Sequence, residues 1–277
     1  MKKIALALAA LAAVSCGAQR KTVSDNKSDV APVESVTAVK SAASAETGKV
    51  AFALSLFNAS LSGKSLSANV VVSPYSAGMA LSMLAEGASG QTKEELTSAL
   101  NHASFAGDKL KGDKSCQLSS ANSIWLRDGF SVLPAYKSLL TGSYSAEINS
   151  RDFSSPATVK EINRWCSDKT NRRIPEIIDE ISPEMVMFIL NALYFKAPWE
   201  YQFDKNSTIK DTFHSPSGDQ EVDFMRIKRQ FSCAEYEGGR FVILPYKGGA
   251  WQMMICLPDE GADIQKLVSS VSSEMFS

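Results

Sequence analysis

Histidine is scarce in this 277-residue sequence, and its scarcity argues against several kinds of catalysis. The two histidines, His102 and His214, both lie in polar surroundings typical of surface residues. A Ser-His-Asp nucleophile needs a histidine presented to a serine, and the sequence has no G-x-S-x-G elbow. Paired carboxylates and clusters of metal ligands are also missing. We therefore predict no catalytic residue, no metal and no cofactor.

Cysteine is sparse too, and none of the cysteines after the N-terminus is spaced as C-x-x-C. The four are Cys116, Cys166, Cys233 and Cys256. Their spacing indicates neither a zinc site nor a redox motif. Cys166 and Cys256 have apolar neighbours, so we expect both to be small buried hydrophobic residues. The spacing assigns no disulfide.

An excess of basic charge is absent as well. Lysine and arginine total 29 against 30 aspartates and glutamates, a net charge of -1. Without a basic block there is no reason to expect binding to nucleic acid. Apolar residues make up 44% and charged residues 21% of the sequence, which is typical of a globular protein with one large or two smaller domains.

A long hydrophobic run is missing, but a short one stands at the N-terminus. Residues 4–14 are apolar, follow two lysines and are too few to span a membrane. The apolar segment ends within Ala13-Val14-Ser15-Cys16. This motif resembles a bacterial lipoprotein cleavage box with Cys16 as the lipidated residue. An ordinary secretory signal is the alternative. We expect residues 1–16 to be the signal peptide.

The residues after Cys16 are expected to tether a folded domain to the membrane. Residues 17–45 are rich in Ser, Ala, Lys and Val without clear periodicity, which favours a flexible linker. Acyl chains on Cys16 would hold the domain, residues 46–277, on a membrane surface without spanning it. Gly17 differs from the acidic inner-membrane retention signal. The predicted location is therefore the bacterial cell envelope, as an outer-membrane lipoprotein facing the periplasm or the exterior.

The rest of the chain is expected to fold around residues 185–199, MVMFILNALYFKAPW. The apolar run at 185–190 suits a strand buried on both faces, at the centre of a sheet. Asn191 is the polar exception. Because a buried amide costs free energy unless its groups find partners, Asn191 predicts a polar cluster inside the core.

Helices are predicted mainly before this strand and strands mainly after it. Ser73 is a predicted N-cap with Pro74 at the first helical position, and Thr92 with Glu95 matches a capping box. The predicted helices are an amphipathic one with residues 50, 53, 54 and 57 on one face, 74–86, a segment beginning at Thr92, 133–140, 156–170 and a last one that begins at residue 264. The predicted strands cover 70–72, 120–126, 146–153, 222–225, 231–236, 240–245 and 251–257. This order favours an α+β fold.

Four motifs, taken together and in order, resemble the serpin family. They are Asn69-Val-Val-Val-Ser73-Pro74 with Gly87-Ala-Ser-Gly90-Gln-Thr92; Ile162-Asn163-Arg-Trp165 with Thr170-Asn171; Asn191-Ala-Leu-Tyr-Phe195-Lys196 with Trp199; and Phe241-Val-Ile-Leu-Pro245-Tyr246 with Met254-Ile-Cys-Leu257-Pro258. The resemblance implies a multi-helix N-terminal half packed on a large mixed sheet, plus part of a smaller barrel sheet. It also implies that Ser73, Ser76 and Asn191 form the family's shutter cluster and that Trp199 stands at the breach, where loop insertion starts.

The same resemblance implies an inhibitor of serine or cysteine endopeptidases. In serpins the target protease cleaves a reactive loop, which then inserts into the main sheet beside its third strand. That loop, and the fifth strand with its shutter histidine, would follow residue 277. We therefore expect these residues to be the front part of a longer serpin without the reactive bond. The alternatives are a non-inhibitory or decayed serpin-fold binding module and, less favoured, an envelope hydrolase.

Overall fold

The computed structural model describes residues 3–11, 34–61, 70–215, 218–236 and 238–271. The helices are α1 (Glu34–Leu61), α2 (Pro74–Glu86), α3 (Gly90–Ala99), α4 (Pro134–Ser143), α5 (Pro156–Lys169) and α6 (Ile264–Ser270), with one 3-10 turn at Lys205–Ser207. The strands are β1 (Lys3–Leu11), β2 (Gln117–Arg127), β3 (Glu147–Arg151), β4 (Met185–Lys196), β5 (Ile209–Ser215), β6 (Gly218–Phe224), β7 (Cys233–Tyr236), β8 (Gly239–Pro245) and β9 (Gln252–Pro258).

The main sheet has the order β1-β4-β2-β3 and mixes both strand directions. β4 runs antiparallel to β2 and parallel to β1, while β2 and β3 are parallel. Residues 186–193 of β4 are all buried, which confirms the prediction of a central strand covered on both faces.

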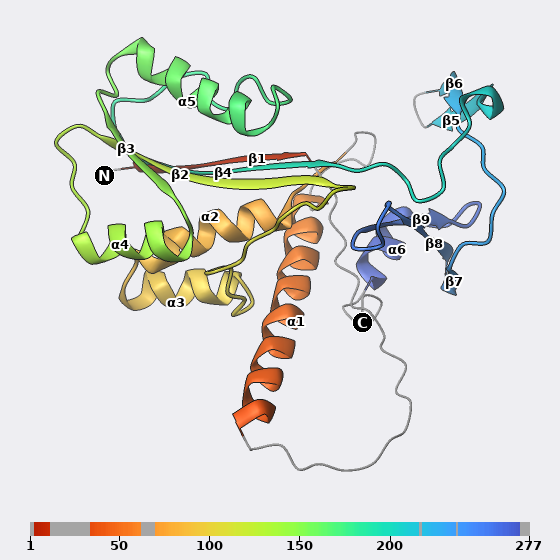
Figure 1. Ribbon diagram of the computed structural model, residues 1–277, viewed down its shortest axis with the longest axis horizontal. Coiled ribbons are helices and arrows are strands. Elements are labelled where there is room, and N and C mark those ends of the chain that lie inside the picture. The colour runs from red at the N-terminus through yellow and green to blue at the C-terminus, as the bar shows by residue number, and fades with distance from the viewer. Residues whose placement is uncertain (1–2, 12–33, 62–69, 216–217, 237, 272–277) are drawn as a thin grey trace.

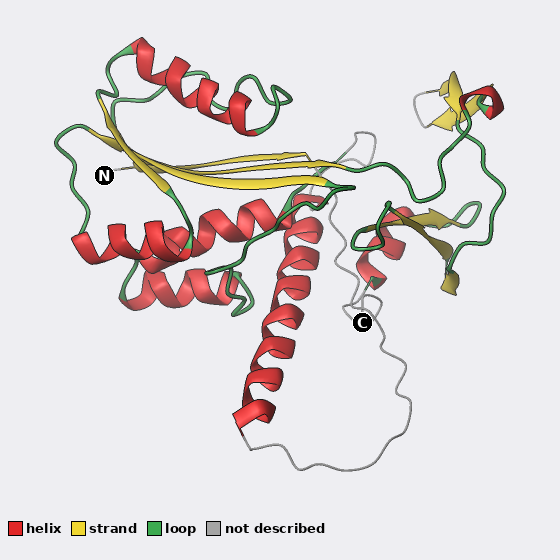
Figure 2. Cartoon of the chain, viewed as in Figure 1, coloured by secondary structure: helices red, strands yellow, loops and turns green. Residues whose placement is uncertain are grey.

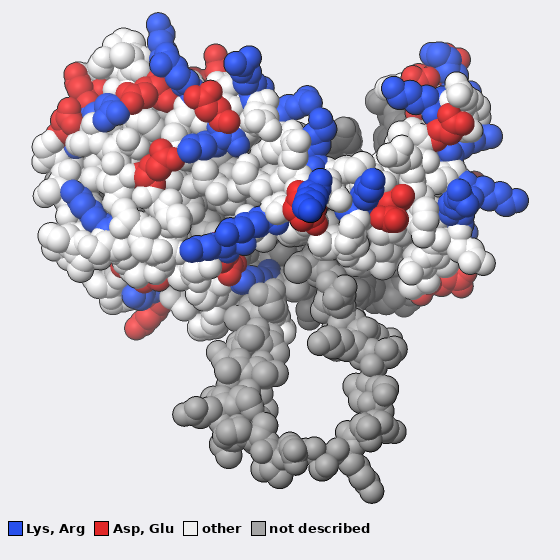
Figure 3. All heavy atoms as spheres, viewed as in Figure 1, with Lys and Arg blue, Asp and Glu red and all other residues white. Residues whose placement is uncertain are grey.

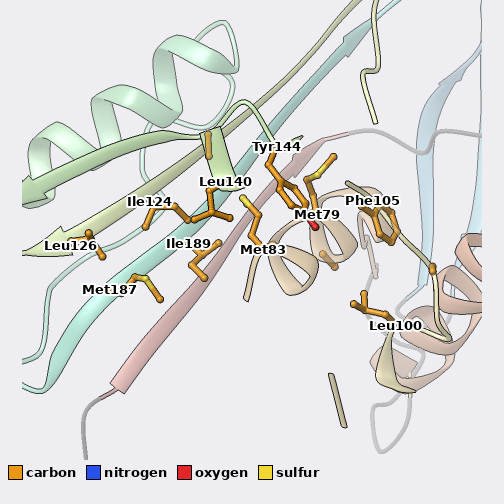
Figure 4. Packing of buried hydrophobic residues seen from close by; sticks show 14 of the residues in the cluster. Met79, Met83, Leu100, Phe105, Ile124, Leu126, Leu140, Tyr144, Met187 and Ile189 are labelled. Atoms are coloured by element: carbon orange, nitrogen blue, oxygen red, sulfur yellow. The ribbon is translucent and has the colours of Figure 1, made fainter. Parts of the chain in front are cut away.

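Helices cover both faces of this sheet, as Figures 1 and 2 show. α2 packs against one face, where Met79 and Met83 meet Ile124 of β2 and Ile189 of β4 (Figure 4). α5 lies on the opposite face, where Ile162 and Cys166 belong to a second cluster with Phe188, Leu190 and Trp125. Side chains alternate between faces along a strand, so consecutive apolar residues of β4 supply both cores.

The predicted N-cap residue is confirmed for α2 and wrong for α3. Ser73 caps α2, since its Oγ accepts a hydrogen bond from the backbone N–H of Ser76 at 3.4 Å, and Pro74 opens the helix. The Thr92 N-cap is wrong, because α3 begins at Gly90 with Ser89 as its N-cap residue. The predicted strand at residues 70–72 is also wrong, since this segment has no regular structure.

The N-terminal boundary differs from the expected one. α1 begins at Glu34, so residues 34–45 are helical where a flexible linker was expected. This segment is rich in alanine and has no proline or glycine, so nothing in it interrupts a helix. Cys16 and Gly17 lie outside the described residues. No helix in the described part of the chain is long and apolar enough to cross a membrane.

The second half forms two smaller antiparallel sheets. β7, β8 and β9, which correspond to the strands predicted at 231–236, 240–245 and 251–257, form an open three-stranded antiparallel sheet, and β5 pairs with β6 in a hairpin. β5 was not predicted, because its side chains from Lys210 to His214 are exposed and show no apolar alternation. Figure 1 shows these sheets beyond the end of β4, away from α2–α5.

Candidate functional site

Asn191 lies in the middle of β4 and is completely buried. Its Nδ2 donates hydrogen bonds to Oδ1 of Asn122 at 2.8 Å and to Oγ of Ser120 at 3.0 Å, both on β2. Asn122 and Asn191 stand directly opposite each other in the β2–β4 ladder. The polar cluster predicted from Asn191 therefore exists, and it bridges the two central strands.

The cluster continues from β2 to the end of α4. The Nδ2 of Asn122 donates to the backbone carbonyl of Tyr144 at 2.7 Å, while its Oδ1 accepts from Asn191. Both polar atoms of the buried Asn122 side chain therefore have a hydrogen-bond partner. Ser120 and Asn122 were missed by the sequence interpretation. The polar residues Ser120, Asn122 and Ser123 at the start of the predicted strand 120–126 were the signal that could have found them.

One atom of the cluster is left without a partner among the described residues. Oδ1 of Asn191 is buried and accepts no hydrogen bond. An unsatisfied buried acceptor costs about 1–3 kcal/mol, so such a group in a folded protein calls for an explanation. The residue of β1 opposite Asn191 in the ladder is Leu8.

Ser73 and Ser76 form a separate pair at the start of α2. The Ser73 hydroxyl donates to Oγ of Ser76 at 3.2 Å, and Ser76 is fully buried. Neither hydroxyl is hydrogen-bonded to Asn191, whose partners are on β2. The expected three-residue cluster is therefore two hydrogen-bonded groups on the α2 side of the sheet. Tyr75, which precedes Ser76 in α2, has its pKa raised well above the usual value by burial and, less strongly, by Asp108.

Trp199 follows β4 where the chain leaves the main sheet. Its ring stacks on Tyr246 with centroids 4.5 Å apart and an interplanar angle of 9°, and it meets Phe203 edge-on at 6.2 Å. Phe195 of β4 contacts both Tyr246, at 5.0 Å, and Trp251, at 5.9 Å. An aromatic cluster thus joins the end of β4 to the turn between β8 and β9.

The side of β4 that faces away from β2 accepts a strand. In the structure this place is taken by β1, which pairs in parallel from Lys3 opposite Met185 to Leu11 opposite Tyr194. These are residues that the sequence predicts to be a signal peptide. The backbone of β4 is therefore able to pair along nearly its whole length on both sides.

Features that would indicate catalysis are not found in the described part of the chain. It holds no group of three or more potential metal ligands. His214 is exposed and lies 2.8 Å from Asp219 across the β5–β6 hairpin, and His102 is also exposed. Acidic and basic side chains are interspersed over the face shown in Figure 3, without a large patch of one sign.

The four described cysteines are all free. Cys116 and Cys166 are buried, Cys256 is half-buried and Cys233 is exposed. Burial raises the pKa of the Cys166 thiol to about 11, which keeps it protonated and unreactive at neutral pH. The expectation of burial is confirmed for Cys166 and only partly met by Cys256.

Comparison with known proteins identifies the class to which this fold belongs. The family model described as "Serpin (serine protease inhibitor)" matches residues 47–277. An uncharacterized serpin-like protein of Thermococcus kodakarensis is 35% identical over 207 residues, covering 70% of this chain and 49% of that protein. A serine protease inhibitor of Cyanea capillata is 34% identical over 229 residues, covering 76% and 60%.

Solved serpin structures also match this fold. The native stressed conformation of Arabidopsis AtSerpin1 matches with a TM-score of 0.73 and 30% identity, covering 83% of this chain and 65% of that one. The chain belongs to the serpin family, which the matching family model describes as serine protease inhibitors. It spans about half to three fifths of the length of these two curated relatives.

Proposed function

We propose that the protein to which these 277 residues belong is a serpin-type inhibitor of serine or cysteine endopeptidases. In this proposal a target protease cleaves a reactive loop, and the loop inserts as a strand beside β4. The loop is not among the motifs of these residues, and the protease is its partner. The chain described here contributes the receiving strand, the polar cluster around Asn191 and the aromatic cluster around Trp199.

The carrying observation is that the outer side of β4 pairs with a strand along nearly its whole length, a place that β1 takes in the structure. If residues 1–16 are removed as a signal peptide, β4 has an unpaired edge flanked by apolar side chains on both faces. An edge of this kind readily adds a strand, and strand addition supplies main-chain hydrogen bonds along the whole length. The orphan Oδ1 of Asn191 favours an incoming neighbour that carries a side-chain donor at that position.

We further propose that the protein is tethered to the bacterial envelope through a lipid on Cys16. The support is the sequence alone: a basic start, a short apolar segment and a cysteine after small residues. A lipid anchor would place the inhibitor where extracytoplasmic proteases are met. Labelling the host with a radioactive fatty acid tests this, because Cys16→Ala should abolish incorporation while a control variant, Cys233→Ala, should not.

The inhibitory function is tested on the natural protein isolated from its host. Its intact mass shows whether residues follow position 277, and incubation with trypsin-like, chymotrypsin-like and papain-like proteases then tests inhibition. We expect a covalent complex with one protease that survives boiling in detergent. Cleavage of the protein without any complex, across all these proteases, would refute inhibition.

A non-inhibitory binding module is the second candidate, since a serpin fold alone does not guarantee inhibition. In that case the protein would either be cleaved without trapping its protease or have the mass of 277 residues plus lipid. The discriminating measurement is the thermal midpoint before and after cleavage. Insertion of a cleaved strand beside β4 should raise it strongly, whereas a module without insertion should show no such increase.

A further inference from the structure

The outer side of β4 is occupied by β1, which belongs to the segment that the sequence predicts to be a signal peptide, residues 1–16, called the leader here. β1 runs parallel to β4, from Lys3 opposite Met185 to Leu11 opposite Tyr194, with one irregularity after its first residue. Figure 1 shows the two strands side by side, with β1 at the edge of the main sheet. The leader and the folded domain therefore share one sheet.

This edge of β4 lies where unpaired peptide groups are costly. α2 contacts both β4 and β1, and α5 contacts β4 from the opposite face. Helices on both faces keep water away, and peptide groups shielded from water must find partners inside the protein. Because alternate residues of a strand direct their N–H and C=O groups outward, about half of the peptide groups of β4 find their partners on β1.

The sequence of β1 alternates with the period of a strand. Isoleucine or leucine stands at positions 4, 6 and 8, and alanine stands at positions 5, 7 and 9. The register pairs the three alanines with Phe188, Leu190 and Ala192, which are the residues of β4 in the core cluster shared with α5. A leader is defined by its charge, its apolar segment and its cleavage site, and none of these requires alternation. The alternation is what a fixed register with β4 requires, because a shift of one residue would exchange the larger residues and the alanines.

We propose that residues 3–11 serve as a temporary strand that keeps the outer side of β4 closed until the leader is cut off. An apolar edge with free peptide groups adds strands from other chains, which is a route to aggregation. While β1 is in place, this edge is closed to a second copy of the chain and to any other strand. Proteolytic removal of a segment then opens the edge. The inference rests on the proposed function for its timing, since it needs the leader to be cleaved, whereas the pairing itself does not depend on inhibition.

Disulfide cross-linking in the full chain tests the pairing and its register. Translation in a cell-free extract without membranes produces residues 1–277 with the leader retained. Ala9 and Ala192 are partners in the ladder, and neighbouring strands lie about 5 Å apart, which is within reach of a disulfide. We expect Ala9→Cys with Ala192→Cys to give a cross-linked peptide on mild oxidation. Ala10→Cys with Ala192→Cys, one residue out of register, is the matched control and should lose it.

Two proline variants test whether β1 closes the edge of β4. Because successive N–H groups of a strand point to opposite sides, only one of Ala7→Pro and Leu8→Pro removes a hydrogen bond to β4. The other is tolerated, since β1 is an edge strand and its outward N–H has no neighbouring strand. The probe is a fluorescent peptide with the sequence of residues 3–11. We expect it to bind the disrupted variant about 10-fold more tightly than the wild type or the tolerated variant, through the loss of a ladder bond. The same peptide carrying the disruptive proline is the control and should not bind.

Three outcomes would overturn the proposal: equal cross-linking of the two cysteine pairs, no cross-link in either pair, and equal binding of the peptide to wild type and both proline variants. No protease takes part in these experiments, so they are independent of inhibition. A chain that pairs its leader in this register but traps no protease would refute the inhibitory function and leave the temporary strand standing. An inhibitor whose leader forms no cross-link to β4 would refute the temporary strand alone.

Discussion

Replacing Asn191 by alanine is expected to lower the free energy of unfolding by about 2–3 kcal/mol. Two good hydrogen bonds disappear, each contributing about 1 kcal/mol net. The removed amide also leaves a small cavity in a fully buried place, which costs roughly 1–2 kcal/mol more. The substitution relieves the unsatisfied Oδ1, and this returns about 1 kcal/mol.

Urea unfolding followed by tryptophan fluorescence measures this change, because Trp125 of β2 and Trp165 of α5 both belong to the buried core between α5 and the sheet. Asn122→Ala and the double variant complete a mutant cycle. The 2.8 Å bond between the two amides is lost in either single variant, so we expect the double variant to be less destabilised than the sum by about 1 kcal/mol.

The reasoning fails if Asn191→Ala changes stability by less than about 0.5 kcal/mol, the size of an ordinary surface substitution. It also fails if the two single effects add fully, because the amides would then not be coupled. Asn206→Ala, at an exposed position, is the control for the measurement and should be neutral.

Three further predictions concern the backbone and the thiols. Gly78→Ala should destabilise the protein by about 1–3 kcal/mol in urea unfolding, because the added Cβ would lie 2.2 Å from the buried ring of Phe105; no loss would mean that the ring moves freely. Arg172→Gly should raise the thermal midpoint, since Arg172 has a φ of 60° and the left-handed conformation costs a non-glycine residue about 1–2 kcal/mol; an unchanged midpoint would contradict this. Iodoacetamide at pH 8 should label the exposed Cys233 quickly and Cys166 only after unfolding, because burial raises the pKa of Cys166 to about 11; labelling of native Cys166 at a similar rate would refute its burial.

The sequence predicted the centre of the fold well because that centre depends on local hydrophobic pattern. A continuous apolar run is typical of a strand covered on both faces or of a buried helix, and the short run at residues 185–190 favours the strand. The α2 signals, serine before proline, were equally local. Asn191 stood out because a lone amide in such a run has to be paired.

The polar residues of β2 can be noticed in the sequence, but their pairing with Asn191 could not be predicted, since it depends on the register between distant strands. Nothing local in the sequence indicates that Asn122 lies opposite Asn191, and a shift of one residue would have placed it on the other face. The same limit explains why Ser73 and Ser76 were grouped with Asn191 although the hydrogen bonds divide them. β5 was missed for another reason, because an exposed hairpin strand has no hydrophobic pattern to detect.

The pairing of β2 with β4 has a consequence for how this protein folds. Ser120 and Asn191 are hydrogen-bonded although they are 71 residues apart in the chain. The sheet cannot close until the chain as far as β4 has emerged, whereas α2 and α3 need only short-range contacts. Such distant pairing slows folding. The segment between β2 and β4, which contains α4, β3 and α5, must therefore be synthesised before the two central strands can meet, and the chain stays open longer than a helical bundle of the same length would.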